Sequence, residues 1–290
     1  MSHVVMCHGI GYQYEHRETS LTPWYGALRA SLTDAALPVP EPERVSAVFY
    51  GNCFRSLKGG KAAVSDDENE LDDIPNFRSG DVRDPFEAAL LEAFAQGTEE
   101  PQEGGKGLVQ SALRRLERSE RLGRPPAKVA IWAVRQVRRY LDPADTVHAC
   151  AQQRFERVVT PDTRVVVAHS LGSVVAYEAL CAHPEWNIDT FVTLGSPLGI
   201  GEIRDRLRPS GAGAWPHVRR WVNIAAKEDP IALVKELAPL FDERVDDRTV
   251  VNLPWYRPAR HVLGGHAVTR YLTTADLAEA VGAALLAGER

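Results

Sequence analysis

The sequence predicts an α/β fold in which helices cover both faces of a mostly parallel central sheet. Short apolar runs rich in β-branched residues alternate along the chain with segments of helical periodicity, which is typical of parallel strands joined by crossover helices. The run TRVVVAH at 163–169 is apolar almost throughout, as expected of a strand covered on both sides. Hydrophobic residues make up 44% of the 290 residues and charged residues 25%, so the chain can build a sizeable core.

Six strands are expected from the apolar runs and the turn residues that end them, at 4–7, 44–50, 163–169, 188–194, 219–225 and 248–253. Helices are expected at 23–37, 85–96, 108–122, 128–141, 144–158, 171–182 and 267–286. Thr22 is the expected N-cap of the first helix, and Pro23 its first residue. The last helix is expected to break near Thr273 and Thr274.

A long segment, 56–143, separates the second and third strands and is predicted to be a helical cap or lid inserted into a single domain, 1–290. Its acidic run at 66–73 is expected to be a solvated loop, and 99–107 a connector rich in Gly, Pro and Glu. The helix at 128–141 is amphipathic and carries three arginines. Such a helix either packs on its own core or lies on an anionic membrane surface as a peripheral contact, and Trp132 is expected to line an acyl pocket.

Charge and cysteine content narrow the class of protein. The formal net charge of −5 argues against nucleic acid as a partner. The first residues lack the basic and long apolar regions of a secretion signal, and no run reaches the ~20 apolar residues of a membrane span, so a cytoplasmic location is predicted. The four cysteines are widely spaced, and isolated buried thiols are expected rather than a disulfide framework or a zinc site.

The pentapeptide 168–172, Ala-His-Ser-Leu-Gly, lies between a predicted strand and a predicted helix. A serine on such a sharp turn is exposed as a nucleophile, provided that small residues two positions before and after it let strand and helix approach each other. Ala168 and Gly172 meet that requirement. The amino end of the helix also favours negative charge beside Ser170, so Ser170 is the predicted nucleophile.

A serine needs a neighbouring base and an acid that orients it. His266 follows two glycines and precedes a helix, and it is the predicted base, with His261 as its competitor. Asp229, in the loop after the strand at 219–225, is the predicted acid. The alternatives for the acid are the neighbouring carboxylates Glu228, Asp242, Asp246 and Asp247.

Two backbone N–H groups are needed to stabilise the oxyanion of an acyl-transfer intermediate. Leu171, the residue after the nucleophile, is expected to supply one of them. The second is expected from Ile10, because the loop His8-Gly9-Ile10-Gly11 follows the first strand.

Five segments together resemble the α/β-hydrolase superfamily, in particular its lipase-like serine esterases and the branch similar to inositol deacylases. They are VVMCHGIG, VVVAHSLGSVVAYEAL, FVTLGSPLGI, VNIAAKEDPIA and GGHAVTRYL, which cover the first strand and most of 160–275 but not 56–143. Ala168 departs from the glycine common in the family, and the family's leading hairpin is expected to be absent. The resemblance implies hydrolysis of a small-molecule or lipid ester, with the catalytic roles given above and no cofactor or metal.

Other functions fit the same residues. A thioesterase or an acyltransferase would use the same triad, since function is determined by the pocket rather than by the fold. A non-catalytic binding protein on a hydrolase fold is the alternative from a different class, and the complete set of Ser170, Asp229 and His266 argues against it. Nothing in the sequence favours an amide substrate or identifies a protein partner.

Overall fold

The computed structural model describes residues 3–13, 17–55, 74–96, 108–119, 127–208, 213–252 and 264–287. Six parallel strands form one sheet in the order β2-β1-β3-β4-β5-β6. Their bounds are β1 His3–Cys7, β2 Val45–Val48, β3 Thr163–His169, β4 Thr190–Leu194, β5 Arg220–Ala226 and β6 Asp246–Val250. The predicted α/β class is therefore confirmed, and each strand overlaps its predicted range.

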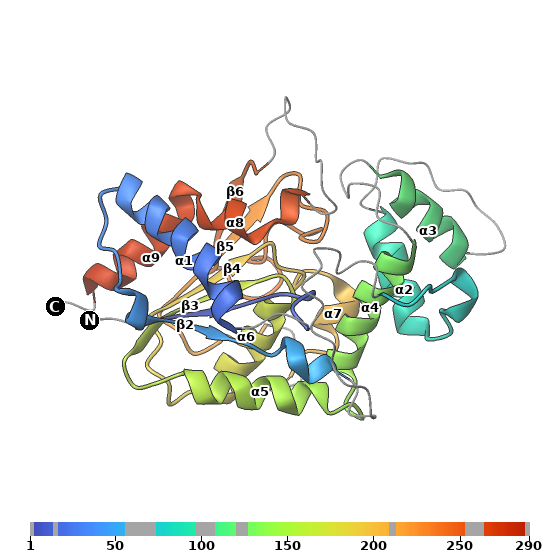
Figure 1. The fold of residues 1–290 in the computed structure, drawn as a ribbon, viewed down its shortest axis with the longest axis horizontal. Coiled ribbons are helices and arrows are strands. Elements are labelled where there is room, and N and C mark those ends of the chain that lie inside the picture. The colour runs from blue at the N-terminus through green and yellow to red at the C-terminus, as the bar shows by residue number, and fades with distance from the viewer. Residues whose placement is uncertain are drawn as a thin grey trace.

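Helices cover both faces of the sheet (Figure 1). On one face lie α1 (Arg17–Asp34), α8 (Val268–Leu272) and α9 (Ala275–Ala287), and on the other lie α5 (Val147–Val158) and α6 (Leu171–Ala182). Successive strand residues point to opposite faces, so Val4 and Met6 of β1 belong to one apolar core, and Val5 and Cys7 to the other. The inner strands β1, β3, β4 and β5 are buried on both sides, which explains their nearly continuous apolar sequence, whereas the edge strand β6 (DDRTV) is only partly buried.

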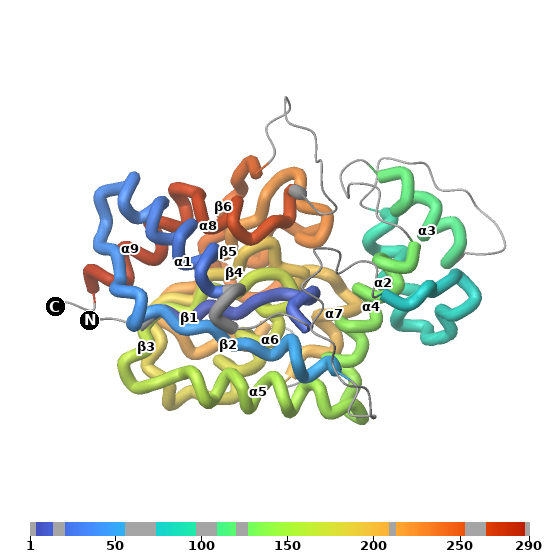
Figure 2. Tube along the Cα trace, in the orientation of Figure 1, coloured from blue at the N-terminus to red at the C-terminus, as the bar shows by residue number. Residues whose placement is uncertain are grey.

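The described part of 56–143 is helical. It holds the short η3 (Ser79–Asp81) and three helices, α2 (Pro85–Gln96), α3 (Leu108–Arg118) and α4 (Ala127–Leu141), which pack on one another. Figure 2 shows this group, called the cap below, beside the end of the sheet where α7 (Gly201–Arg204) lies. The predicted acidic loop at 66–73 and the connector at 99–107 lie outside the described residues. Among the described helices, none is both long and apolar enough to cross a membrane.

The start of the first helix was predicted wrongly. Helix α1 begins at Arg17, and Pro23 lies inside it rather than at its first position. A proline in the second turn removes a single intrahelical hydrogen bond, a loss that the rest of an 18-residue helix accommodates. The predicted break in the last helix is confirmed, since α8 ends at Leu272 and α9 begins at Ala275.

The expectation of four isolated thiols was also wrong. Cys53, in the 3-10 turn η2 (Gly51–Phe54), forms a disulfide with Cys150 of α5, while Cys7 and Cys181 are free and buried. The pair is separated by 97 residues, and the fold brings α5 back against the end of β2. Disulfides persist mainly in oxidising compartments, so this bond counts against the predicted cytoplasmic location.

The strand order creates a crevice at the carboxyl ends of β1 and β3. The chain leaves β1 to form α1 on one face of the sheet, and it leaves β3 to form α6 on the other face. Loops that depart to opposite faces leave a gap between them, where α/β proteins bind ligands. The loop at 8–11 and Ser170 both lie at this position.

Candidate active site

Ser170 occupies the turn between β3 and α6. Its backbone has φ 55° and ψ −132°, a conformation uncommon for a non-glycine residue and frequent at functional sites. The turn is held on both sides, because the Ser170 N–H donates to the Leu194 carbonyl at 3.0 Å and the Ser173 hydroxyl donates to the Ser170 carbonyl at 2.6 Å. The serine is 6% exposed, so its side chain is buried.

Two glycines allow this turn to pack closely against β1. A Cβ on Gly172 would lie 2.3 Å from the His8 carbonyl oxygen, and a Cβ on Gly9 would lie 2.7 Å from the Ser170 Cβ. Both distances are far inside van der Waals contact. A small residue two positions after the serine is therefore required, as predicted, because the backbone at the end of β1 lies against it.

His266 and Asp229 form a buried pair beside this turn. His266 ends the 3-10 turn η4 (Gly264–His266), and its Nδ1 lies 2.7 Å from the Asp229 Oδ2. The turn is held to the segment just after β6 by Asn252, whose side-chain amide donates to the Gly265 carbonyl at 3.1 Å. With Nδ1 bound to a carboxylate, Nε2 is left to act on a hydroxyl. Ser170 and His266 line the same cavity.

Asp229 is surrounded by hydrogen-bond donors. Its Oδ2 accepts from His266 and from the Tyr271 hydroxyl, at 2.5 Å for the latter, and its Oδ1 accepts from the Ile231 and Ala232 N–H groups at 2.7 and 3.3 Å. Burial alone would raise the pKa of Asp229. The charge of His266 and the hydrogen bonds outweigh burial and lower that pKa to about 2. Asp229 is therefore a carboxylate at neutral pH.

His169 is a neighbour of this pair whose role has no signal in the sequence. Its Nε2 lies 2.7 Å from the His266 carbonyl oxygen, which can only accept a hydrogen bond, so the His169 proton is on Nε2. The two imidazole rings are 4.4 Å apart. Burial, followed by the charge of His266, lowers the pKa of His169 to about 3. A neutral His169 thus holds the backbone of His266 without adding a second positive charge.

The loop after β1 is fixed by His8. The Tyr50 N–H donates to His8 Nε2 at 3.1 Å, so Nδ1 carries the proton and donates to the Gly9 carbonyl at 2.7 Å. The Tyr50 ring stacks on the imidazole at 4.3 Å, and its hydroxyl donates to the His8 carbonyl at 2.8 Å. Burial lowers the pKa of His8 to about 4. The backbone leading to Ile10 is therefore anchored to the end of β2.

A cavity of about 140 Å³ extends from Ser170 into the cap. Ile10 and Leu171, the predicted oxyanion donors, line it together with Ser170 and His266. The rest of its lining is almost entirely apolar and includes Leu91 and Phe94 of α2, Leu116 of α3, and Val129, Ala130, Ala133, Val134 and Val137 of α4. Trp132 is not part of this lining and is half-buried elsewhere on α4. Residues three or four apart share one face of a helix. The face of α4 that lines the cavity carries Ala133 and Val137, and Trp132 is not on it.

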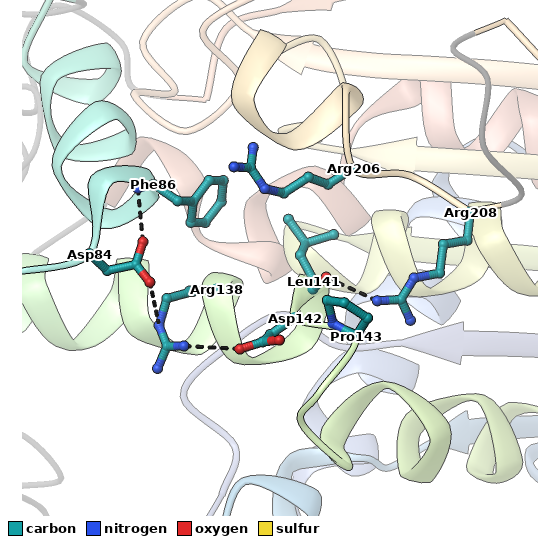
Figure 3. Close-up of a pocket in the computed structure, with 8 residues that line it drawn as sticks. All are labelled: Asp84, Phe86, Arg138, Leu141, Asp142, Pro143, Arg206 and Arg208. Atoms are coloured by element: carbon teal, nitrogen blue, oxygen red, sulfur yellow. Dashed lines mark hydrogen bonds and ion pairs between the residues drawn. The ribbon is translucent and has the colours of Figure 1, made fainter.

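A second, more open cleft of about 420 Å³ lies where α2 and α4 meet the segment after α7 (Figure 3). Arg206 lies 4.3 Å from the centre of the Phe86 ring, and Arg208 donates to the Leu141 carbonyl at 3.0 Å. Arg138 contacts the carboxylates of Asp84 and Asp142, at 3.8 and 3.2 Å. The contacts of Arg206 and Arg208 fasten the cap to the segment after α7, whereas the Arg138 ion pairs lie within the cap. None of the predicted site residues lines this cleft.

The alternative acids are engaged elsewhere. Glu228 accepts from the Asn252 N–H, Asp242 is paired with Arg244, Asp246 with Arg220 and Arg248, and Asp247 with the side chain of Asn223 and the N–H groups of Leu237 and Ala238. His261 lies outside the described residues. Among the described residues, Asp229 is thus the predicted acid that meets His266.

Neither the comparison with protein families nor those with curated proteins and solved structures found a match. Within the described ranges, no three His, Cys, Asp or Glu side chains are grouped as metal ligands would be. Any proposal about function therefore rests on the sequence and on the geometry of the site.

Proposed function

We propose that the protein is a serine hydrolase of the α/β-hydrolase type that cleaves carboxylic esters with apolar acyl groups. The observation that carries this proposal is the buried His266–Asp229 pair, joined at 2.7 Å, whose imidazole lines the same cavity as a serine on a positive-φ turn. A serine at positive φ and a buried carboxylate are each energetically unfavourable on their own, and an acyl-transfer site uses both together with the imidazole between them.

In the proposed reaction, the Ser170 Oγ attacks the ester carbonyl while His266 Nε2 takes its proton. The negative oxygen of the tetrahedral intermediate accepts hydrogen bonds from the N–H groups of Ile10 and Leu171. His266 then returns the proton to the leaving alcohol, and an acyl-enzyme forms. Water, deprotonated by the same imidazole, releases the acid. Asp229 remains ionised throughout and stabilises the imidazolium.

The cavity supports an apolar acyl group. Beyond the reacting residues and His169, its wall consists of apolar side chains, most of them from the cap, so a polar chain would lose its hydration without gaining partners. An apolar chain would gain about 0.8 kcal/mol for each buried methylene. The apolar face of α4 lines this cavity and packs in the core of the cap. That α4 also contacts a membrane surface stays a prediction.

The test of the nucleophile is labelling with a fluorophosphonate probe, together with hydrolysis of an ester series. Ser170→Ala should abolish labelling and lower the rate by several orders of magnitude. Ser31→Ala removes another buried serine, on α1, and should change neither. Wild-type labelling of Ser170→Ala would refute the proposal, and a complete lack of labelling of the wild-type protein would favour the non-catalytic alternative.

The test of the acyl pocket is a substitution that fills it. Ala133→Leu should shift the preference towards shorter acyl chains, because Ala133 lines the cavity. Ala149→Leu adds the same volume on the exposed side of α5 and serves as the control. An unchanged acyl-length profile in Ala133→Leu would place the acyl group elsewhere. Thioesters and acceptor alcohols in the same series distinguish a hydrolase from a thioesterase or an acyltransferase.

A further inference from the structure

We infer that Tyr271 is a positioning residue for the acid of the triad, which it holds through its hydroxyl group. This inference rests on the proposed function, because it assigns a role in that reaction. Tyr271 lies on α8, five residues after His266, and its ring is fully buried. It touches neither the cavity nor Ser170 among the described contacts, so it would act through Asp229.

The hydroxyl of Tyr271 has two partners that fix its direction. It accepts a hydrogen bond from the Ala226 N–H, at the end of β5, at 2.9 Å. Its own proton is therefore free to point at the Asp229 Oδ2, 2.5 Å away. Burial, together with the charge of Asp229, raises the pKa of Tyr271 far above its usual value, so the phenol stays protonated and remains a donor.

This contact determines which way the carboxylate faces. Oδ2 receives both the Tyr271 hydroxyl and the His266 Nδ1, while Oδ1 is held by two backbone N–H groups. Without the hydroxyl, Oδ2 has one donor less and is free to shift within its hydrogen bond to His266, so the imidazole is held less precisely towards Ser170. The hydroxyl also takes up part of the negative charge on Oδ2. It therefore limits how strongly Asp229 attracts the proton of His266.

The matched test is Tyr271→Phe, which keeps the buried ring and removes only the hydroxyl. We expect kcat to fall roughly tenfold with KM unchanged, the equivalent of about 1.4 kcal/mol. We also expect the acid limb of the kcat/KM profile to move to higher pH, because an unshared carboxylate holds the proton of His266 more tightly. The other titratable groups facing this cluster are His169 and Glu228, and both remain in the variant.

Tyr177→Phe is the control, since Tyr177 is also buried and its hydroxyl donates to a backbone carbonyl, that of Ala214, at 2.8 Å. It should lose stability without moving the pH profile. An unmoved acid limb in Tyr271→Phe, whether kcat falls or not, would overturn the inference and leave Tyr271 a structural residue.

NMR titration of the His266 ring protons gives a readout that needs no substrate. The midpoint should be higher in Tyr271→Phe than in the wild-type protein, and equal midpoints would overturn the inference. If Ser170→Ala kept full activity, the proposed function would fail, yet this titration would still report the coupling of Tyr271 to the pair. The two failures are therefore distinguishable.

Discussion

Gly195→Ala is expected to disable the site without touching any of its three reacting side chains. Gly195 follows β4 with φ +55°, and a Cβ there would lie 2.5 Å from the Asp229 Oδ2 and 2.9 Å from the His266 Nδ1. Ordinary contact begins near 3.4 Å, so the carboxylate would have to move by about 0.9 Å. Its four hydrogen-bond donors oppose that movement, and the 2.7 Å bond to His266 is the contact most exposed to it.

The expected loss follows from this displacement. A misplacement of about 1 Å lowers activity by roughly 100-fold, and alanine at positive φ costs about 1–2 kcal/mol. Ester hydrolysis and urea unfolding measure the two effects separately. Gly26→Ala is the control, because a Cβ on Gly26 of α1 meets nothing within 4 Å and should leave activity unchanged while stabilising the helix. A folded Gly195→Ala protein with wild-type activity would refute the role given to the Asp229–His266 pair.

Three further predictions concern stability. Gly172→Ala should lower the free energy of unfolding by about 3 kcal/mol or more, seen as a large fall in Tm, because the new Cβ would meet the His8 carbonyl at 2.3 Å. Acidification from pH 6.5 to about 4 should destabilise the fold, since His8 and His169 stay neutral in it but are protonated when unfolded. Each then costs up to about 1.4 kcal/mol per pH unit, and a flat curve of unfolding free energy against pH would contradict this. Cys53→Ser should cost roughly 4 to 5 kcal/mol, the value for a closed loop of this length, and a reducing agent should have no further effect on the variant.

The strands and the serine turn could be predicted because their determinants are local. A strand covered on both faces has to be apolar at nearly every position, as at 163–169, and a sharp strand-to-helix turn has to have small neighbours, as at Ala168 and Gly172. The pairing of His266 with Asp229 was predicted from chain order and from their positions after strands. The choice among the candidate acids could be made only from the structure, in which the competing carboxylates have other partners.

What the sequence did not reveal depends on contacts between distant segments. Cys53 and Cys150 meet only because the chain returns to the end of β2 after a long insertion. His169 and Tyr271 act on the backbone of His266 and on the side chain of Asp229, and neither contact has a signature in local periodicity. Trp132 was predicted from size and apolarity, whereas the rotation of α4 about its axis decides which of its residues face the cavity.

The segments that follow β1, β3 and β4 share one structural requirement that ties the fold to the proposed chemistry. Each has a glycine at which a Cβ would collide with a neighbouring group, namely Gly9 with Ser170, Gly172 with the backbone of β1, and Gly195 with Asp229. Adjacent parallel strands are only about 4.8 Å apart. Side chains at their carboxyl ends can therefore come together only where a neighbouring residue has no side chain of its own. From sequence alone these glycines indicate turns. In the structure, Gly9 and Gly195 leave the space that Ser170 and the Asp229–His266 pair occupy, and Gly172 lets the serine turn approach the backbone at the end of β1. Activity should therefore be as sensitive to these glycines as to the triad itself.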